Sequence, residues 1–248
     1  MRRFFCHAVI AALLLAPAAG FAAETQVAVA ANFTEPAKEI AAAFTKATGD
    51  TAVLSFGSSG AFYTQIAHGA PFEVFLSADA DRPKLAEQDG LAVRGSRFTY
   101  AIGRLVLYSA TPGLVDDRGA VLKTGSFAHL SIADPVAAPY GVAAMQTIAK
   151  LGLGPALTPK LVKGSSITQA YQFVATGAAE LGFVAASQVV NVSGGSRWVV
   201  PAKLHTPIEQ QVVLLKTGAA NPAAAGFAKF LRSPAAVAII KRYGYEVK

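Results

Sequence analysis

The chain has 248 residues, enough for one large domain or for two lobes of about 100 residues each. Hydrophobic residues make up 53% of the chain and charged residues 15%, which excludes a disordered protein. The formal net charge is +7, but no run of Lys and Arg is longer than the pair at residues 2–3. Composition therefore gives no support to a nucleic-acid partner, which calls for clustered basic residues interleaved with aromatic ones.

Residues 1–22 have the pattern of a secretory signal peptide. A short basic end precedes an apolar stretch from Ala8 to Leu15, and small residues follow, so we expect cleavage after Ala22 or Ala23. The apolar stretch is shorter than the roughly 20 residues that span a membrane. The only cysteine, Cys6, leaves with this segment, which excludes disulfides and thiol chemistry in the mature chain. The remaining 20 basic and 15 acidic residues give a net charge of +5, and we expect a soluble periplasmic protein.

Strands alternate with helices over short links in the rest of the chain. We expect strands at residues 25–31, 51–56, 73–77, 98–109, 130–133, 161–162, 181–184 and 208–216. We expect helices beginning at residues 34, 61, 79, 142, 167, 222 and 234. Such alternation predicts an α/β fold whose sheets are mostly parallel and flanked by helices.

Two of the expected strands are long enough to connect two bodies. The stretch 98–109 changes its hydrophobic period near Gly103, and 208–216 is the second such segment. We therefore expect a hinge of two crossing strands between a first lobe, residues 24–104 plus 206–248, and a second lobe, residues 105–205. A cleft between two such lobes is a favoured place for a small-molecule site.

Motifs for catalysis and for metal binding are missing from the sequence. The run from Gly57 to Gly60 lacks the spacing of a nucleophile elbow, because Ala61 stands where a glycine is needed. The histidines of the mature chain are scattered and lack a cluster of acidic neighbours. We expect no enzyme, no metal site and no cofactor; an exported hydrolase that uses Ser58 or Ser59 is the rival from another class.

Small or hydroxyl residues recur where a strand ends and a helix begins. The four stretches are Ala31-Asn32-Phe33, Ser58-Ser59-Gly60, Pro139-Tyr140-Gly141 and Ser165-Ser166-Ile167. A helix start carries unpaired N–H groups and about half a positive charge, so several starts that face one cleft make an anion site. The alternative is that these Ser and Asn side chains only cap their helices.

Several stretches resemble the periplasmic molybdate-binding proteins of ABC transporters, which are type II solute-binding proteins. They are residues 29–33 (VAANF), 56–60 (FGSSG), 69–79 (GAPFEVFLSAD), 134–135 (DP), 138–141 (APYG), 181–184 (LGFV) and 235–245 (AAVAIIKRYGY). The segment 69–79 is the most specific of them. The resemblance implies a two-lobed periplasmic-binding-protein fold and a monomeric receptor that captures molybdate or tungstate and delivers it to a membrane permease.

The resemblance also implies a set of ligand-binding residues. By position, the anion contacts of the family fall on Asn32, Ser59, Tyr140 and Ile167, mostly through main-chain N–H groups, with Ser58 and Ala31 as neighbours.

The sequence departs from one branch of this family. The branch typified by enteric bacteria has Ser at the position of Asn32, a small residue at Tyr140 and a Tyr at Ala185. This chain resembles the other branch, which leaves open whether the side chains of Asn32 and Tyr140 touch the ligand. The closest rival function is a receptor for another oxyanion, such as sulfate or phosphate.

Overall fold

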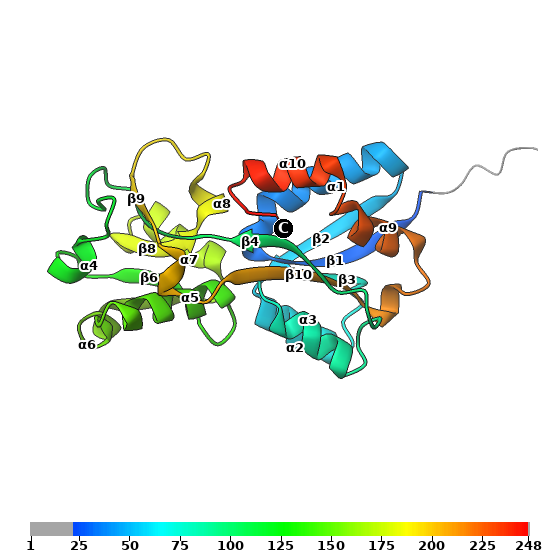
Figure 1. Cartoon of the computed structure of the whole chain (residues 1–248), viewed down its shortest axis with the longest axis horizontal. Coiled ribbons are helices and arrows are strands. Elements are labelled where there is room, and N and C mark those ends of the chain that lie inside the picture. Colours follow the sequence, from blue (N-terminus) through cyan, green and yellow to red (C-terminus); the bar gives the residue numbers. More distant parts are fainter. Residues whose placement is uncertain (1–21, 248) are drawn as a thin grey trace, which may run out of the picture.

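A computed structural model describes residues 22–247, so the predicted signal peptide lies outside the described residues except for Ala22. Two five-stranded sheets lie side by side along the long axis of the molecule (Figure 1). Their strand orders are β2-β1-β3-β10-β4 and β7-β6-β8-β5-β9. We call the first sheet with its helices the first half, and the second sheet with its helices the second half.

The first half is built from both ends of the chain. Its strands are β1 (Glu24–Ala30), β2 (Thr51–Gly57), β3 (Val74–Ser77), β4 (Phe98–Gly103) and β10 (Ile208–Leu214). Its helices are α1 (Thr34–Thr48), α2 (Ser59–Ala67), α3 (Asp81–Gln88), α9 (Pro222–Phe230) and α10 (Pro234–Arg242), with short 3-10 turns η1 (Ala31–Phe33) and η4 (Lys216–Gly218). Helices α1 and α10 cover one face of the sheet, and α2 and α3 cover the other (Figure 1).

The second half comes from the middle of the chain. Its strands are β5 (Leu105–Ser109), β6 (Leu130–Ala133), β7 (Leu161–Gly164), β8 (Leu181–Ala185) and β9 (Ser196–Val199). Its helices are α4 (Val121–Thr124), α5 (Pro139–Lys150), α6 (Gly154–Leu157), α7 (Ile167–Ala175) and α8 (Ala186–Val189), with 3-10 turns η2 (Thr158–Lys160) and η3 (Ala202–Leu204).

Four of the five strands in each sheet run in one direction, as the predicted α/β fold requires. In the first sheet β1 pairs in parallel with β2 and β3, and only β10 runs against its neighbours β3 and β4. In the second sheet β6 pairs in parallel with β7 and β8, and only β5 runs against β8 and β9.

Helix α1 illustrates how local sequence produces these elements. Its buried positions include Ala37, Ile40 and Phe44, three and four residues apart, which is the spacing of one helix face. The helix ends at Gly49, whose φ of 85° lies in the left-handed region that favours glycine. This face packs against the first sheet, and the packing fixes the direction of α1 relative to β1.

The two crossings between the halves differ from the predicted pair of long strands. The stretch 98–109 breaks at Arg104 into β4 and β5, which belong to different sheets. The return runs from β9 to β10 through a short connection that contains η3, and β10 itself stays within the first sheet. The sequence did not predict β9, and it placed the second crossing between the halves in β10. In the structure, the connection that contains η3 makes this crossing.

Strand register brings four helix starts to facing edges. Ala30 at the end of β1 lies opposite Gly57 at the end of β2, so η1 and α2 begin side by side. Ala133 at the end of β6 lies opposite Gly164 at the end of β7, so α5 and α7 begin near each other.

Among the described residues, no single helix is long and apolar enough to cross a membrane; α9 and α10 reach that length only together, with a 55° bend between them.

Candidate functional site

A small cavity lies where the four helix starts meet. It encloses about 200 Å³ including the part open to solvent, of which the centre of a water molecule can reach about 10 Å³, and uncharged residues from both halves line it. They are Ala30, Ala31, Asn32, Gly57, Ser58, Ser59, Ala78, Ala138, Pro139, Tyr140 and Ile167. All six predicted binding residues are in this set, so the structure brings them together around one space.

The first half contributes Asn32 and Ser59. Ser59 is the first residue of α2 and Asn32 lies in η1, so neither N–H has an intrahelical acceptor. The Ser59 hydroxyl oxygen accepts a hydrogen bond of 2.9 Å from the N–H of Ala78, which leaves its own proton free to donate. Both residues are buried, with 3% and 1% of their surface exposed.

The second half contributes Tyr140 and Ile167. Tyr140 is the second residue of α5 and Ile167 the first residue of α7, again among the orphan donors of a helix start. Within residues 22–247, the N–H groups of these two residues and of Asn32 and Ser59 donate to no acceptor outside their helices. The cavity therefore gathers four unpaired backbone donors and one hydroxyl.

Helix capping accounts for only one of the candidate side chains. Ser166 accepts from the N–H of Gln169 at 3.3 Å, as a cap does. Ser58 precedes α2 in the cap position, yet its side chain makes no capping hydrogen bond, and the Asn32 side chain makes none either. The capping alternative thus holds for Ser166 but fails at Ser58 and Asn32.

The side chains of Asn32 and Tyr140 are engaged with other protein groups. Asn32 Nδ2 lies 2.9 Å from Gln210 Oε1 and 2.9 Å from the Tyr245 hydroxyl. These two bonds use both amide hydrogens of the Asn32 side chain. The Tyr140 hydroxyl accepts from Gln210 Nε2 at 3.3 Å. Burial raises the pKa of Tyr140 well above its ordinary value, and that of Tyr245 to about 12, so both phenols are neutral at physiological pH.

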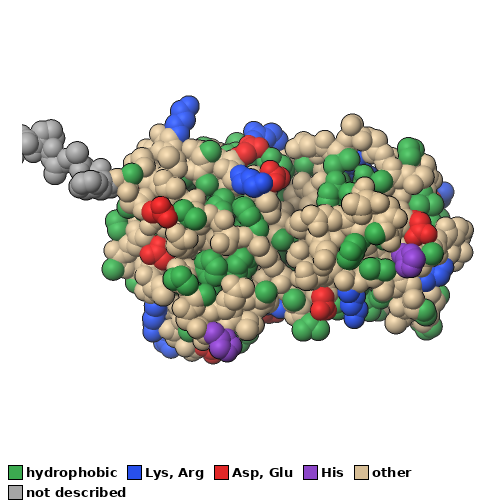
Figure 2. Space-filling view, turned by 180° about the vertical axis from the view of Figure 1, so that it is seen from behind, with side chains coloured by type: hydrophobic (Ala, Val, Ile, Leu, Met, Phe, Trp, Pro, Cys, Tyr) green, Lys and Arg blue, Asp and Glu red, His purple; other side chains and the backbone are tan. Residues whose placement is uncertain are grey.

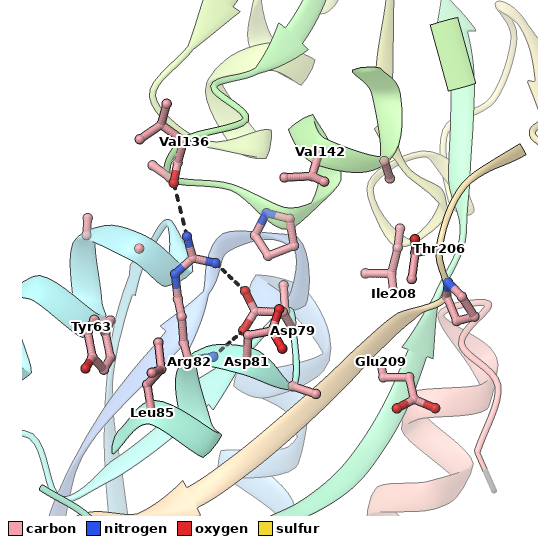
Figure 3. A pocket seen from close by; sticks show the side chains of 18 of the residues that line it. Tyr63, Asp79, Asp81, Arg82, Leu85, Val136, Val142, Thr206, Ile208 and Glu209 are labelled. Carbon is pink, nitrogen blue, oxygen red and sulfur yellow. Dashed lines mark hydrogen bonds and ion pairs between the residues drawn. The ribbon is translucent and has the colours of Figure 1, made fainter. Parts of the chain in front are cut away.

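A larger groove adjoins the cavity and opens between α2, α3 and α5. It encloses about 1970 Å³ of space including its open mouth, and it shares Ala78 and Pro139 with the lining of the small cavity. In Figure 3 Arg82 lies in this groove, paired with Asp79, and its Nη2 donates to the carbonyl of Val136 at 3.1 Å. Because Asp79 neutralises Arg82, the groove offers an anion a weaker site than the donors of the cavity do, despite its size.

Hydrogen bonds across the groove hold the halves together. The N–H of Gly60 donates to the carbonyl of Ala137 at 2.9 Å, alongside the bond from Arg82 to Val136. A Cβ on Gly60 would lie 3.0 Å from backbone atoms of Ala137, so glycine permits this close approach. These two bonds join the halves beside the cavity.

The face seen in Figure 2 shows no concentrated patch of basic side chains. On the face seen in Figure 2, Lys and Arg side chains lie singly or beside acidic ones, with uncharged surface between them. This arrangement differs from the basic stripe that marks a nucleic-acid interface.

Sequence reasoning missed three residues that contact Asn32 or Tyr140. They are Gln210 on β10, Ser187 on α8 and Tyr245 in the C-terminal segment. Gln210 is fully buried, and a polar side chain within an apolar strand was the available signal. Ser187 and Tyr245 carry no such signal, because only the tertiary fold brings them to Asn32.

Comparisons with known proteins agree with this geometry. The family model described as bacterial extracellular solute-binding protein matches residues 25–246. The molybdate-binding protein ModA of Rhodobacter capsulatus is 59% identical over 96% of this chain and 93% of its own length, and ModA of Escherichia coli is 31% identical over 90% and 88%. The solved periplasmic molybdate-binding protein of Azotobacter vinelandii superposes with a TM-score of 0.88 and 44% identity, over 90% of this chain and 99% of that one. The chain belongs to the family of bacterial extracellular solute-binding proteins, and the resemblance to its molybdate-binding members is confirmed.

Proposed function

We propose that this protein is a periplasmic receptor that binds molybdate in the small cavity and delivers it to the permease of an ABC importer. The observation that carries the proposal is the convergence of four unpaired backbone N–H groups and one hydroxyl, from both halves, on an uncharged space. The relatives named above are molybdate-binding proteins, which supports the same ligand here.

Backbone donors suit a doubly charged oxyanion. The N-terminal ends of α2, α5 and α7 point their N–H groups and the positive ends of their dipoles at the cavity. Each hydrogen bond to a charged acceptor contributes about 1.5 to 3 kcal/mol, so five of them offset much of the cost of removing a dianion from water. The net result is binding in the micromolar range or tighter.

The donor set also favours some oxyanions over others. Hydrogen phosphate needs an acceptor for its O–H, and the cavity lining includes no carboxylate among the described residues. Tungstate has the same charge and the same tetrahedral shape as molybdate, and we propose that it binds too. Sulfate is fully ionised but smaller, and it is excluded when the donors stand too far apart to reach it.

Lobe boundaries follow from the crossings. We propose a first lobe of residues 24–104 plus 206–248 and a second lobe of residues 105–205, because Arg104 separates two strands of different sheets. Rotation about the two crossings opens the cleft, and closure around the anion is the state that the permease recognises. We also propose that the leader is cleaved after Ala22 or Ala23 and that the receptor is a monomer.

Receptor activity accounts for the site better than hydrolysis does. The hydroxyl of Ser59 is paired with a backbone N–H, whereas a serine nucleophile needs a general base within hydrogen-bond reach. The relatives are solute-binding proteins, which supports the same conclusion.

An oxyanion panel tests the proposal. The leaderless protein, dialysed free of anions, is heated with molybdate, tungstate, sulfate or phosphate, and calorimetry measures the affinity of each anion that stabilises it. We expect molybdate and tungstate to raise the melting temperature with increasing concentration, and sulfate and phosphate to leave it unchanged at equal ionic strength. A shift with sulfate or phosphate alone would assign the receptor to that anion.

A further inference from the structure

A ring of buried hydrogen bonds lies behind the cavity and crosses between the two halves. Its members are Asn32, Gln210 and Tyr245 from the first half and Tyr140 and Ser187 from the second. Gln210 Nε2 donates to the Tyr140 hydroxyl, Ser187 donates to the carbonyl of Asn32, and Asn32 Nδ2 donates to Gln210 Oε1 and to the Tyr245 hydroxyl. The Tyr245 hydroxyl lies 2.9 Å from Ser187 Oγ and 2.8 Å from the carbonyl oxygen of Asn32, so its one proton has two acceptors within reach.

Gln210 joins the two candidate anion contacts from opposite halves. Its Oε1 lies 2.9 Å from Asn32 Nδ2, and its Nε2 lies 3.3 Å from the hydroxyl of Tyr140. Asn32 and Tyr140 both line the cavity, and their backbone N–H groups have no acceptor within residues 22–247. The distance between these donors therefore depends on the amide of Gln210.

Local backbone features accommodate this amide. The pairing of β10 with β4 shifts register between Gln210 and Gln211, which leaves Tyr100 as the extra residue on β4. Tyr100 donates to Gln210 Oε1 at 3.0 Å. At the end of β4, a Cβ on Gly103 would lie 2.1 Å from the Tyr140 hydroxyl and 2.8 Å from Gln210 Nε2, so the pair fills the space that glycine leaves.

The C-terminal segment holds the other side of the ring. Glu246 and Ile102 exchange two backbone hydrogen bonds, of 2.8 and 3.1 Å, which fix Tyr245 beside β4. Tyr245 then reaches Asn32 and Ser187. The ring thus ties the chain end, the crossing after β4 and both sides of the cavity to one another.

We propose that Gln210 is a positioning residue of the oxyanion site, which holds the N–H donors of Asn32 and Tyr140 in register across the two halves. This inference rests on the proposed function. Because the bond from Gln210 to Tyr140 joins the halves, separating them lengthens it, and its loss destabilises the closed state. The expected consequence is faster release of the anion with little change in its capture.

Three substitutions test the proposal, with calorimetry for affinity and a chase of radiolabelled molybdate for release. Gln210→Met keeps the length of the side chain and removes its bonds to Asn32, Tyr140 and Tyr100, and we expect about a tenfold loss of affinity. Tyr140→Phe removes only the bond that the Tyr140 hydroxyl accepts from Gln210, and we expect a loss of about three- to tenfold, mainly as faster release. In the double variant the losses should not add, because one bond is shared.

Gln211→Met is the matched control. Gln211 is the next residue of β10 and is also buried, but its side chain bonds to Thr99 and Arg97 within the first half. We expect it to lower the unfolding midpoint and to leave affinity and release unchanged.

The outcomes separate this inference from the proposed function. Wild-type protein that binds none of the oxyanions overturns both. Wild-type protein that binds molybdate while Gln210→Met and Tyr140→Phe bind it within twofold as well overturns the positioning role alone, as does an equal loss in Gln211→Met. If Gln210→Met fails to fold, Tyr140→Phe, which deletes one oxygen atom, decides the question by the same criteria.

Discussion

Replacing Ser59 with Ala tests the one side-chain donor proposed for the site. Ser59 is almost fully buried, and its hydroxyl oxygen already accepts from the N–H of Ala78, so the proton is left for the ligand. Ser59→Ala removes one hydrogen bond to a charged acceptor, which costs about 1 to 3 kcal/mol. Affinity for molybdate should therefore fall roughly 5- to 160-fold.

Calorimetry on the leaderless protein measures this loss, and Ser131→Ala serves as its control. Ser131 is also fully buried and donates one hydrogen bond, of 2.9 Å, to the carbonyl of Ala170, but it lies away from the cavity. The control should lower the unfolding temperature without changing the affinity. Equal affinities in wild type and Ser59→Ala would remove the Ser59 hydroxyl from the site and leave the backbone donors to account for binding.

Three further predictions follow from contacts around the cavity. Gly103→Ala places a Cβ against the Tyr140 hydroxyl and Gln210, so both the stability and the molybdate affinity should fall, by about 1 to 3 kcal/mol for the overpacking. Urea titration measures the free energy of unfolding, and calorimetry measures the affinity. If neither quantity changes, the side chains of Tyr140 and Gln210 move freely. Arg82→Gln removes the bond from Arg82 to the Val136 carbonyl across the groove and should speed the release of molybdate about threefold. Lys84 is an exposed charge on the same helix, and Lys84→Gln should leave the release rate unchanged. Equal release rates in the two variants would contradict a role for Arg82 in closure. Burial raises the pKa of Tyr245 to about 12, above the unfolded value near 10, so its contribution to stability is complete below pH 10 and is lost as the pH rises toward 12. Urea titrations from pH 8 to 11 should show this loss of stability, and the loss should be smaller in Tyr245→Phe. A free energy of unfolding that does not change with pH in the wild type would contradict the buried ring.

Sequence alone predicted the candidate site better than it predicted the connections between the halves. Helix starts near Ser59, Tyr140 and Ile167 were predictable because cap residues and proline mark them locally, although α2 and α5 begin two and three residues before the expected positions 61 and 142. Their convergence followed from parallel strands, whose carboxyl ends lie at one edge of a sheet. These patterns are short-range. The register of β1 with β2 and of β6 with β7 then brings the helix starts together around one cavity.

The parts that sequence reasoning missed depend on distant contacts. The change of period near Gly103 indicated a crossing and gave the expected lobe boundary after residue 104, but only the pairing of β4 and β5 with different partners shows that the stretch 98–109 is two strands. Strand β9 is four residues long, too short to show a period. The contacts of Tyr245 with Asn32 and Ser187 join residues 213 and 58 positions apart, and no local pattern encodes such a meeting.

The central claim is that backbone N–H groups of both halves surround the anion, and a crystal structure with molybdate tests it most directly. The anomalous signal of molybdenum locates the ligand without reference to the protein. We predict the peak inside the small cavity, with ligand oxygens 2.7 to 3.2 Å from the backbone nitrogens of Asn32, Ser59, Tyr140 and Ile167. A peak in the outer groove beside Arg82, or one contacted by a single half, would contradict the account.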